Sequence, residues 1–363
     1  HDALPISMNI VIAPDSFKEC LEARRVAEAL ARGIRHGRAQ VSIRLCPMAD
    51  GGEGAIDVLT GAWGARILRR TVTGPAGTPV QARWALMPDD RTAVIEMAEA
   101  SGLGLLNPSR RQPLRTTTLG TGQLIAAALD EGAQRLIVCI GGSATVDGGC
   151  GMARALGVRF LDDRGRDVPE GGGALASIDR IAIDGLDPRL REATVEAACD
   201  VDNPLCGPRG AARTYAPQKG AGPDDVERLE DGLRHLGDCI LRDLGVDVRT
   251  LCGAGAAGGL GAGLVAFLGA TLRPGVELIA EAVGLGDAVA GADLVITGEG
   301  RIDDQSLQGK VPVGVARVAK RHGVPVVAVC GGFSGDPEAL REGGIVAAMA
   351  LAEGPMGVAD SIE

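Results

Sequence analysis

The sequence predicts an α/β protein with two domains: a discontinuous, doubly wound parallel-sheet domain, and a second α/β domain inserted in it. Short runs rich in Val and Ile alternate with longer stretches of helical periodicity at both ends of the 363-residue chain. The middle has a different texture and opens with strands of antiparallel type. We therefore expect one domain from residues 8–62 plus 287–363 and the inserted domain from residues 63–286, with no internal repeat of fixed period.

Periodicity predicts the elements of the discontinuous domain. Residues 21–35 place Val26, Leu30 and Ile34 at helical spacing, which is typical of an amphipathic helix. Helices of this kind separate five β-branched runs, so the two ends of the chain would form one doubly wound sheet. The expected strands are 9–13, 41–46, 293–297, 324–329 and 345–351, and the other expected helices are 306–321 and 337–342.

The inserted domain mixes the two kinds of strand connection. Three runs near its start are expected to be antiparallel, because only short turn segments separate them. Later strands alternate with helices, which is typical of parallel pairing. The expected strands are 65–72, 80–85, 92–97, 136–140 and 195–199, and the expected helices are 123–130, 224–242, 261–268 and 276–282.

Composition excludes several classes of function. The net charge of −10 and an aromatic content of 2% argue against a nucleic-acid partner, which would need a basic face and stacking side chains. No apolar run reaches the roughly 20 residues that span a bilayer. Nine Cys residues without a C-x-x-C pair, several in apolar strands, indicate a reduced, cytoplasmic setting. Four His residues make a His-rich zinc site improbable. Residues 1–7 are expected to be a non-native leader ahead of Met8.

Polar and glycine-rich clusters follow the predicted strands. Ligands of parallel α/β sheets bind beyond the carboxyl ends of the strands, where helix N-termini present N–H groups to anions. Any one cluster could be an ordinary turn or helix cap, whereas six together favour an anionic ligand and a metal. The six runs are NIVIA–PDSFK, IRLCPMA–DGGEG, RLIVCI–GGSATVDGG, VEAAC–DVDNPL, DLVIT–GEGRIDDQS and VPVVAV–CGG.

The GGSAT segment at residues 141–145, called here the glycine loop, is a plausible phosphate cradle. It offers consecutive N–H groups and the hydroxyls of Ser143 and Thr145 at a strand end. A glycine turn that caps a helix is the alternative interpretation. The loop is neither a Walker A motif nor a G-x-G-x-x-G fingerprint. Residues 116–122 (TTTLGTG) are a similar case.

Acidic and basic residues at other strand ends complete the candidate site. Asp200 and Asp202 place two carboxylates on one side of an extended chain, which suits Mg²⁺ shared with substrate phosphates; a solvated turn is the alternative. Arg301 and Lys310 stand among acids and could neutralise an anion, as could Lys18. For the lysines the alternative is an ordinary surface position.

Eight ordered motifs resemble the bacterial type I glycerate kinase family over nearly the whole chain from Met8. The sequence departs from the family pattern at Glu19, where Gly is usual, and at Val146, where Asn is common. From the resemblance we also expect the sequence to end before the final helix of such proteins, which would affect stability more than chemistry. The motifs are APDSFK (13–18), ADGGEG (49–54), EMAEASGL (96–103), GGSATVDGG (141–149), CDVDNPL (199–205), PQKGA (217–221), GAAGGLG (255–261) and TGEGRIDDQSLQGK (297–310).

The resemblance implies an ATP-dependent, Mg²⁺-dependent kinase that phosphorylates a hydroxyl of D-glycerate, with 2-phosphoglycerate as the favoured product and glycerate and ATP as partners of a monomer or homodimer. Phosphoryl transfer needs positioning and charge neutralisation more than covalent chemistry. Asp147 or Asp304 would accept the hydroxyl proton. In full, the expected nucleotide-binding residues are Gly141, Gly142, Ser143, Ala144, Thr145, Gly258, Gly259 and Glu299; the metal ligands are Asp200 and Asp202; and the catalytic residues are Lys18, Asp147, Arg301, Asp304 and Lys310.

Three rival interpretations remain open. A solute-binding protein for small hydroxy acids would also have two α/β domains, although it would not explain so many acid pairs. An NAD-dependent hydroxy-acid dehydrogenase acts on similar substrates, but the G-x-G-x-x-G fingerprint is missing. A Mg²⁺-dependent phosphatase would differ in its product.

Overall fold

The computed structural model describes residues 8–17, 20–37, 40–52, 54–303 and 310–351. These residues divide into two compact units. The first takes its described residues from 1–50, 57–64 and 274–363, and the second from 51–56 and 65–273. Residues 274–286, which the sequence places in the inserted domain, belong to the first unit. Whether these units coincide with independently folding domains stays a prediction.

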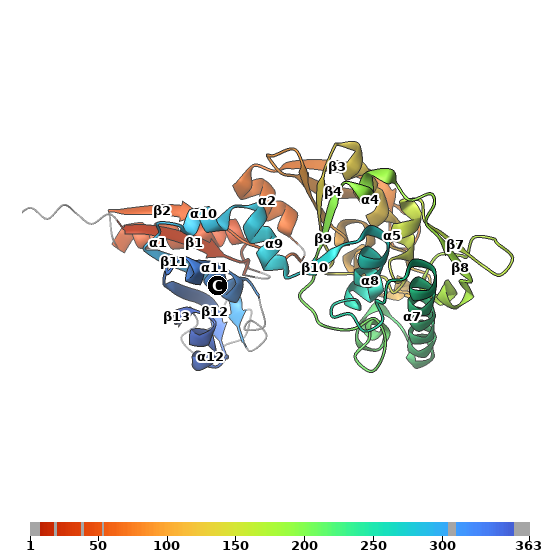
Figure 1. The fold of residues 1–363 in the computed structure, drawn as a ribbon. Coiled ribbons are helices and arrows are strands. Elements are labelled where there is room, and N and C mark those ends of the chain that lie inside the picture. The colour runs from red at the N-terminus through yellow and green to blue at the C-terminus, as the bar shows by residue number, and fades with distance from the viewer. Residues whose placement is uncertain (1–7, 18–19, 38–39, 53, 304–309, 352–363) are drawn as a thin grey trace, which may run out of the picture. The chain divides into compact units, whose positions relative to one another are not determined.

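The first unit is built on a five-stranded parallel sheet of order β13-β12-β11-β1-β2 (Figure 1). All five strands were expected from the sequence, and their parallel pairing confirms the doubly wound class. Their apolar side chains pack against α1 through Ile10, Ile12, Ala27 and Ala31. The strands are β1 (Met8–Pro14), β2 (Val41–Leu45), β11 (Leu294–Ile302), β12 (Val326–Phe333) and β13 (Ile345–Ala350).

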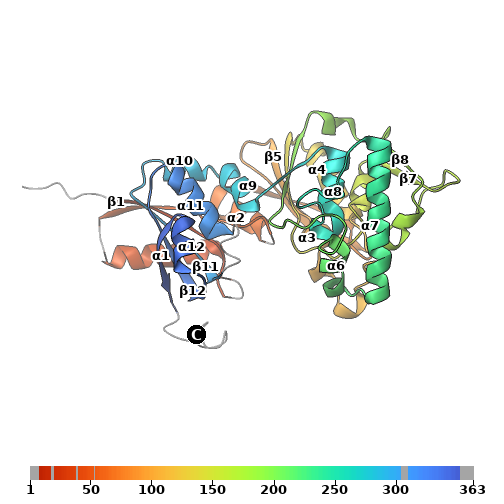
Figure 2. The ribbon, with the colours of Figure 1, turned by 60° about the horizontal axis from the view of Figure 1, so that its bottom comes forward.

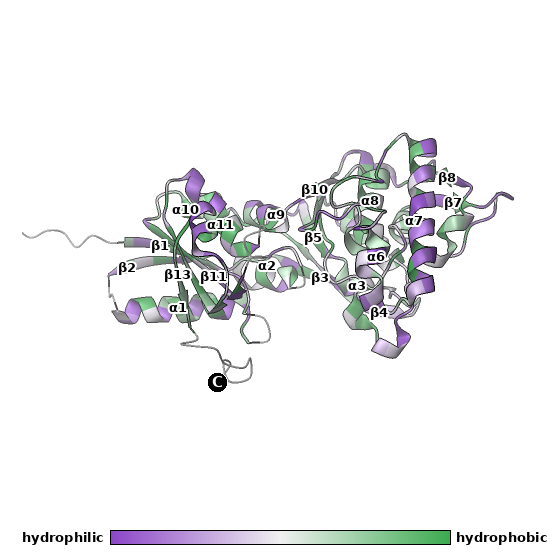
Figure 3. Cartoon of the chain, turned by 90° about the horizontal axis from the view of Figure 1, so that it is seen from below, coloured by the Kyte–Doolittle hydropathy of each residue, from purple (hydrophilic) through white to green (hydrophobic). Residues whose placement is uncertain are grey.

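Helices cover both faces of this sheet, as a doubly wound connection requires. Figure 3 shows α1 on one face and α10 with α11 on the other, and α1 alternates between hydrophilic and hydrophobic colour along its length. That alternation is the amphipathic pattern the sequence predicts. The helices are α1 (Ala23–Gly37), α2 (Ala55–Trp63), α9 (Gly275–Ala282), α10 (Leu285–Val289), α11 (Val311–Arg321) and α12 (Pro337–Glu342).

The second unit is built on a six-stranded sheet of order β10-β9-β6-β5-β4-β3. Its first three strands along the chain are antiparallel neighbours and the other pairs are parallel, as expected. The short β10 and a separate two-stranded sheet of β7 and β8 were not predicted. The strands are β3 (Arg66–Thr73), β4 (Pro79–Leu86), β5 (Thr92–Glu96), β6 (Arg135–Cys139), β7 (Arg159–Leu161), β8 (Arg180–Ala182), β9 (Thr194–Ala198) and β10 (Thr271–Arg273).

Helices of the second unit pack on this sheet around one large apolar core. Figure 2 shows α7 as the long green helix beside α8. Asp224 and Asp225 lie in the first turn of α7, where they complement the helix dipole, and Gly245 ends it with φ 73°. The helices are α3 (Ala98–Ser101), α4 (Leu119–Asp130), α5 (Cys150–Ala155), α6 (Ala211–Tyr215), α7 (Pro223–Leu244) and α8 (Ala256–Leu268), with 3₁₀ turns η1 (Leu103–Leu105), η2 (Pro108–Arg110), η3 (Gly172–Ser177), η4 (Pro188–Arg191) and η5 (Pro217–Lys219).

None of the helices in the described residues is long and apolar enough to cross a membrane.

Candidate active site

The glycine loop follows β6 in the second unit and is fixed from several sides. Leu103 N–H donates to the Gly142 carbonyl at 2.8 Å, and Ala144 N–H donates to the Ser101 carbonyl at 2.9 Å. Thr116 donates its hydroxyl to the Ala144 carbonyl at 2.9 Å. Gly141 and Gly142 are exposed, whereas the remaining three residues of the loop are buried. The loop therefore presents its glycine backbone to solvent and anchors its other half in the core.

Asp147 holds the chain immediately after the loop. Its carboxylate accepts hydrogen bonds from Thr118 N–H (2.8 Å), the Thr118 hydroxyl (2.9 Å), Gly149 N–H (3.1 Å) and Gly151 N–H (3.2 Å). Burial raises the pKa of this carboxyl, and the four donors act in the opposite direction. Asp147 is only 1% exposed, so the geometry favours a role in building the loop over proton exchange with a substrate.

Gly258 and Gly259, at the start of α8, lie directly behind the glycine loop. A methyl group at Gly258 would lie 2.0 Å from the Thr145 carbonyl oxygen, and one at Gly259 would lie 2.9 Å from Gly148 Cα. Both glycines also have positive φ, 68° and 89°. Only glycine allows this approach, so the GAAGGLG motif supports the loop from inside.

Asp200 and Asp202 follow β9, the neighbour of β6 in the same sheet. Both are exposed. Arg209 donates a hydrogen bond to Asp202 and lowers the pKa of its carboxyl. Asn203 is held by Tyr215, whose hydroxyl donates to its side-chain oxygen at 2.6 Å. Across the described ranges no group of three or more His, Cys, Asp or Glu side chains could hold a metal by itself. Two exposed carboxylates do fit Mg²⁺, which usually takes one or two protein carboxylates together with waters and substrate phosphates.

The remaining predicted site residues belong to the first unit. Glu299 is buried on β11, and Arg301, two residues further along that strand, is exposed and donates to the Ser334 hydroxyl at 3.2 Å. Lys310 is half-buried at the residue that precedes α11. Lys18 and Asp304 lie outside the described residues. The structure thus gathers the glycine loop, Asp147 and the two α8 glycines into one cluster in the second unit, whereas Arg301 and Lys310 belong to the first unit.

Sequence reasoning missed Lys219, the last residue of η5. Its Nζ lies 2.5 Å from Ser143 Oγ and 2.8 Å from the Thr145 carbonyl oxygen, and the residue is 2% exposed. Burial lowers the pKa of this amine to about 7, and the nearby charge of Asp147 opposes the shift. One signal could have identified it: only four of the 37 basic residues are lysines, and this one stands in the PQKGA motif.

Sheets of this topology, with a glycine loop at a strand end, define an α/β protein of the kind that binds anionic ligands there. A sequence profile described as the glycerate kinase family matches residues 10–363. Over 356 residues, 98% of this chain and 93% of the relative, the chain is 50% identical to the glycerate kinase of Bacillus subtilis strain 168. It is 47% identical to the glycerate 2-kinase of Escherichia coli K12 over 95% of this chain and 90% of that one. The chain belongs to the glycerate kinase family.

The fold agrees with a solved structure as well. A crystal structure of a protein provisionally described as glycerate kinase 2 from Salmonella typhimurium LT2 superimposes with a TM-score of 0.89 at 47% identity. The match covers 98% of this chain and 93% of that chain.

Proposed function

We propose that this protein transfers the γ-phosphoryl group of ATP to a hydroxyl of D-glycerate, with 2-phosphoglycerate as the product, and that it is a cytoplasmic enzyme of the type I branch of its family. The match to the glycerate kinase family across residues 10–363 carries this proposal. The relative named glycerate 2-kinase, at 47% identity, supports the 2-hydroxyl as the acceptor.

The nucleotide site of this proposal is the glycine loop. Its exposed half offers backbone N–H groups to the phosphates, and its buried half is fixed before any ligand arrives. Gly258 and Gly259 act through the loop by allowing α8 to approach it. We assign Glu299 to the same nucleotide-binding set on its position in the TGEGRIDDQSLQGK motif.

Mg²⁺, held by Asp200 and Asp202, would neutralise charge on the phosphates when bound. Lys18, Arg301 and Lys310 supply the basic side chains that bind the glycerate carboxylate or the transferring phosphoryl group. Of the two candidate bases we favour Asp304, because four hydrogen-bond donors already engage the carboxylate of Asp147.

Phosphorus NMR of a reaction that contains the purified protein, ATP, Mg²⁺ and D-glycerate tests the proposal directly. We expect ADP and 2-phosphoglycerate in equal amounts. Stoichiometric glycerate binding without ATP consumption would support a solute-binding protein instead, and an absorbance change with NAD would support a dehydrogenase. Inorganic phosphate as the only phosphorus product would indicate a phosphatase.

A variant of Lys18 tests the substrate end of the same proposal. Replacing Lys18 by Ala should raise the KM for glycerate about tenfold or more, because one charge-assisted contact to a carboxylate is lost. The matched control is Lys320→Met at the exposed end of α11, which should leave the kinetics unchanged. If Lys18→Ala leaves both activity and the glycerate KM near wild type, Lys18 is not a site residue.

A further inference from the structure

Lys219 is a lysine in an unusual place. Lysine is almost never fully buried unless it is paired, yet this side chain is 2% exposed. The chain otherwise relies on arginine for positive charge, and the lysines among the described residues are Lys219, the half-buried Lys310 and the exposed Lys320. The amine of Lys219 contacts the buried half of the glycine loop, at 2.5 Å from Ser143 Oγ and 2.8 Å from the Thr145 carbonyl oxygen.

The chemistry of the amine decides how the loop hydroxyls are oriented. An ammonium group donates hydrogen bonds and cannot accept them, so Ser143 Oγ must be the acceptor of this bond. The hydroxyl proton of Ser143 is then directed away from Lys219. The buried hydroxyl of Thr145 also has no hydrogen-bond partner in the part of the chain that the structure describes. The hydroxyl proton of Ser143 is therefore available to an acceptor other than Lys219.

We propose that Lys219 is a positioning residue of the nucleotide site, whose ammonium group turns the Ser143 hydroxyl proton toward a phosphate oxygen of ATP bound at the glycine loop. This inference rests on the proposed function. It adds a residue that never touches the nucleotide and acts through Ser143.

The proposal couples nucleotide binding to a proton. Burial lowers the pKa of Lys219 to about 7, so above that pH the amine is mostly neutral in the absence of ligand. A neutral amine can accept a hydrogen bond from the Ser143 hydroxyl, which then points toward Lys219. A phosphate anion at the loop favours the ammonium form, so ATP binding above pH 7 takes up a proton. Asp147 is the charged group that acts on Lys219, and it also favours the ammonium form.

Isothermal titration calorimetry of ATP binding, repeated at pH 8 in buffers of different ionisation enthalpy, measures this proton directly. We expect the wild type to take up between about half a proton and one proton per ATP, because its amine is largely neutral before binding. Lys219→Met should take up none and should bind ATP about tenfold more weakly, as expected for loss of a charge-assisted hydrogen bond. Its KM for ATP should no longer rise between pH 7 and pH 9, while kcat changes less than threefold.

Lys320→Met is the matched control and should retain the proton uptake, the affinity and the pH profile of the wild type. If Lys219→Met does not fold, Ser143→Ala replaces it, since removal of the acceptor should also weaken ATP binding and abolish the pH dependence of the KM. A wild type that takes up no proton, or a Lys219→Met variant that takes up as much, would overturn the inference.

The two proposals fail in different ways. Formation of phosphoglycerate without ATP-linked proton uptake overturns the role of Lys219 and leaves the kinase in place. Proton uptake that depends on Lys219, without formation of phosphoglycerate, supports the role of Lys219 and overturns the kinase. Absence of any ATP binding to the wild type overturns both.

Discussion

Two neighbouring strand ends of the second unit are built in opposite ways. β6 and β9 pair in parallel from Arg135 with Thr194 to Cys139 with Ala198, so the loops that follow them begin at the same edge of the sheet. The loop after β6 has three buried residues and is bonded from behind. The loop after β9 places Asp200 and Asp202 in solvent.

The two loops differ in how much of the fold depends on them. The buried half of the glycine loop packs in the core of the unit, so the exposed backbone of the loop is held in place. The residues that hold it are therefore also needed for the stability of the fold. The segment with Asp200 and Asp202 leaves both carboxylates in solvent, where they would stay hydrated until the proposed cation binds, and little of the fold depends on them. Substitutions of the residues that support the glycine loop should therefore lower the free energy of unfolding. Substitutions of Asp200 or Asp202 should alter the Mg²⁺ dependence alone.

Gly258→Ala should have the largest effect, because the new methyl group would lie 2.0 Å from the Thr145 carbonyl oxygen and the residue has φ 68°. The backbone of α8 and of the glycine loop would have to move apart, and we expect a loss of about 3–5 kcal/mol in the free energy of unfolding. Urea denaturation followed by circular dichroism measures this loss. ATP binding should weaken in parallel.

Gly245→Ala is the matched control for this variant. Gly245 has a similar φ of 73°, but apart from its chain neighbours and its own helix backbone no atom of the described residues lies within 4 Å of where its methyl group would be. It should therefore show only the strain of the left-handed conformation, about 1 kcal/mol. Equal losses in the two variants would mean that φ, and not contact with the glycine loop, explains the glycine at 258.

Asp202→Asn should have a smaller effect and should leave the fold intact. We expect the Mg²⁺ concentration for half-maximal turnover to rise about tenfold, because one of the two proposed carboxylate ligands loses its charge. The unfolding midpoint should not change, since the side chain is exposed and its ion pair with Arg209 is a surface pair. Kinetics across a Mg²⁺ series, with thermal unfolding of the same samples, provide both measurements.

Asp167→Asn is the control, because Asp167 is also exposed and paired with one arginine, Arg159. It should leave the Mg²⁺ dependence unchanged. If Asp202→Asn shows the same Mg²⁺ dependence as wild type, the segment after β9 is an ordinary solvated turn.

The same contrast explains what could be predicted from the sequence. All five strands of the first unit were predicted because their β-branched runs are bounded by Gly, Asp and Pro. The glycine loop was found as a candidate by its residue types. The contribution of Gly258 was assigned from a motif, and its packing against Thr145 could not be derived, because contacts between residues more than 100 positions apart leave no periodicity in the chain.

Buried polar residues were the hardest to interpret. Asp147 was expected to be a candidate base, but its carboxylate accepts from two nearby backbone N–H groups and from two donors of Thr118, 29 positions away, which only the fold brings to it. Glu96 was part of a motif without a role; its carboxylate accepts from Ile56 N–H at 2.7 Å and Gly54 N–H at 3.2 Å at the start of α2. The sequence shows that a carboxylate is present. Its hydrogen-bond partners in the fold decide whether it caps a helix, holds a loop or takes part in a reaction.

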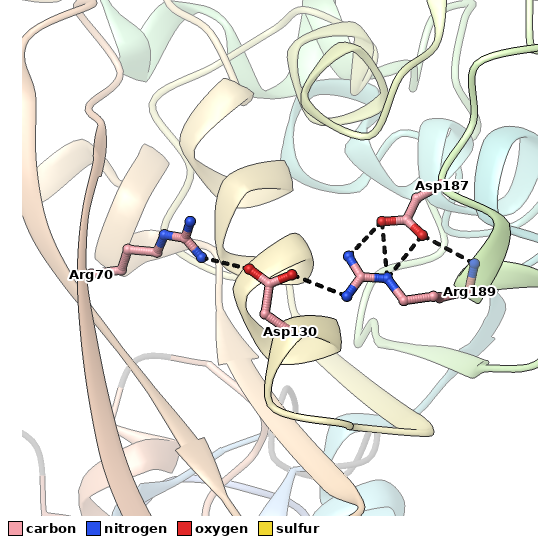
Figure 4. A network of polar contacts seen from close by, with 4 residues as sticks. All are labelled: Arg70, Asp130, Asp187 and Arg189. Carbon is pink, nitrogen blue, oxygen red and sulfur yellow. Dashed lines mark hydrogen bonds and ion pairs between the residues drawn. The ribbon is translucent and has the colours of Figure 1, made fainter.

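Of these substitutions, replacement of Asp130 should have the smallest effect. It is the last residue of α4, and it accepts hydrogen bonds from Arg70 and Arg189, each at 3.0 Å, while Asp187 also binds Arg189 (Figure 4). The Asp130 side chain is 52% exposed. Asp130→Asn should therefore cost no more than about 0.5–1 kcal/mol in the free energy of unfolding and leave turnover and Mg²⁺ dependence unchanged.

The pH dependence of this loss identifies its cause. Hydrogen bonds from Arg70 and Arg189 lower the pKa of Asp130 below its ordinary value of 3.8. Its contribution is thus present above that value and disappears as the pH falls through the lowered pKa, where wild type and Asp130→Asn should have equal stability. Urea titrations at neutral and acidic pH, at low and high salt, would measure the difference. A loss of stability that persists at acidic pH and at high salt would mean that Asp130 stabilises α4 by packing and not by its charge.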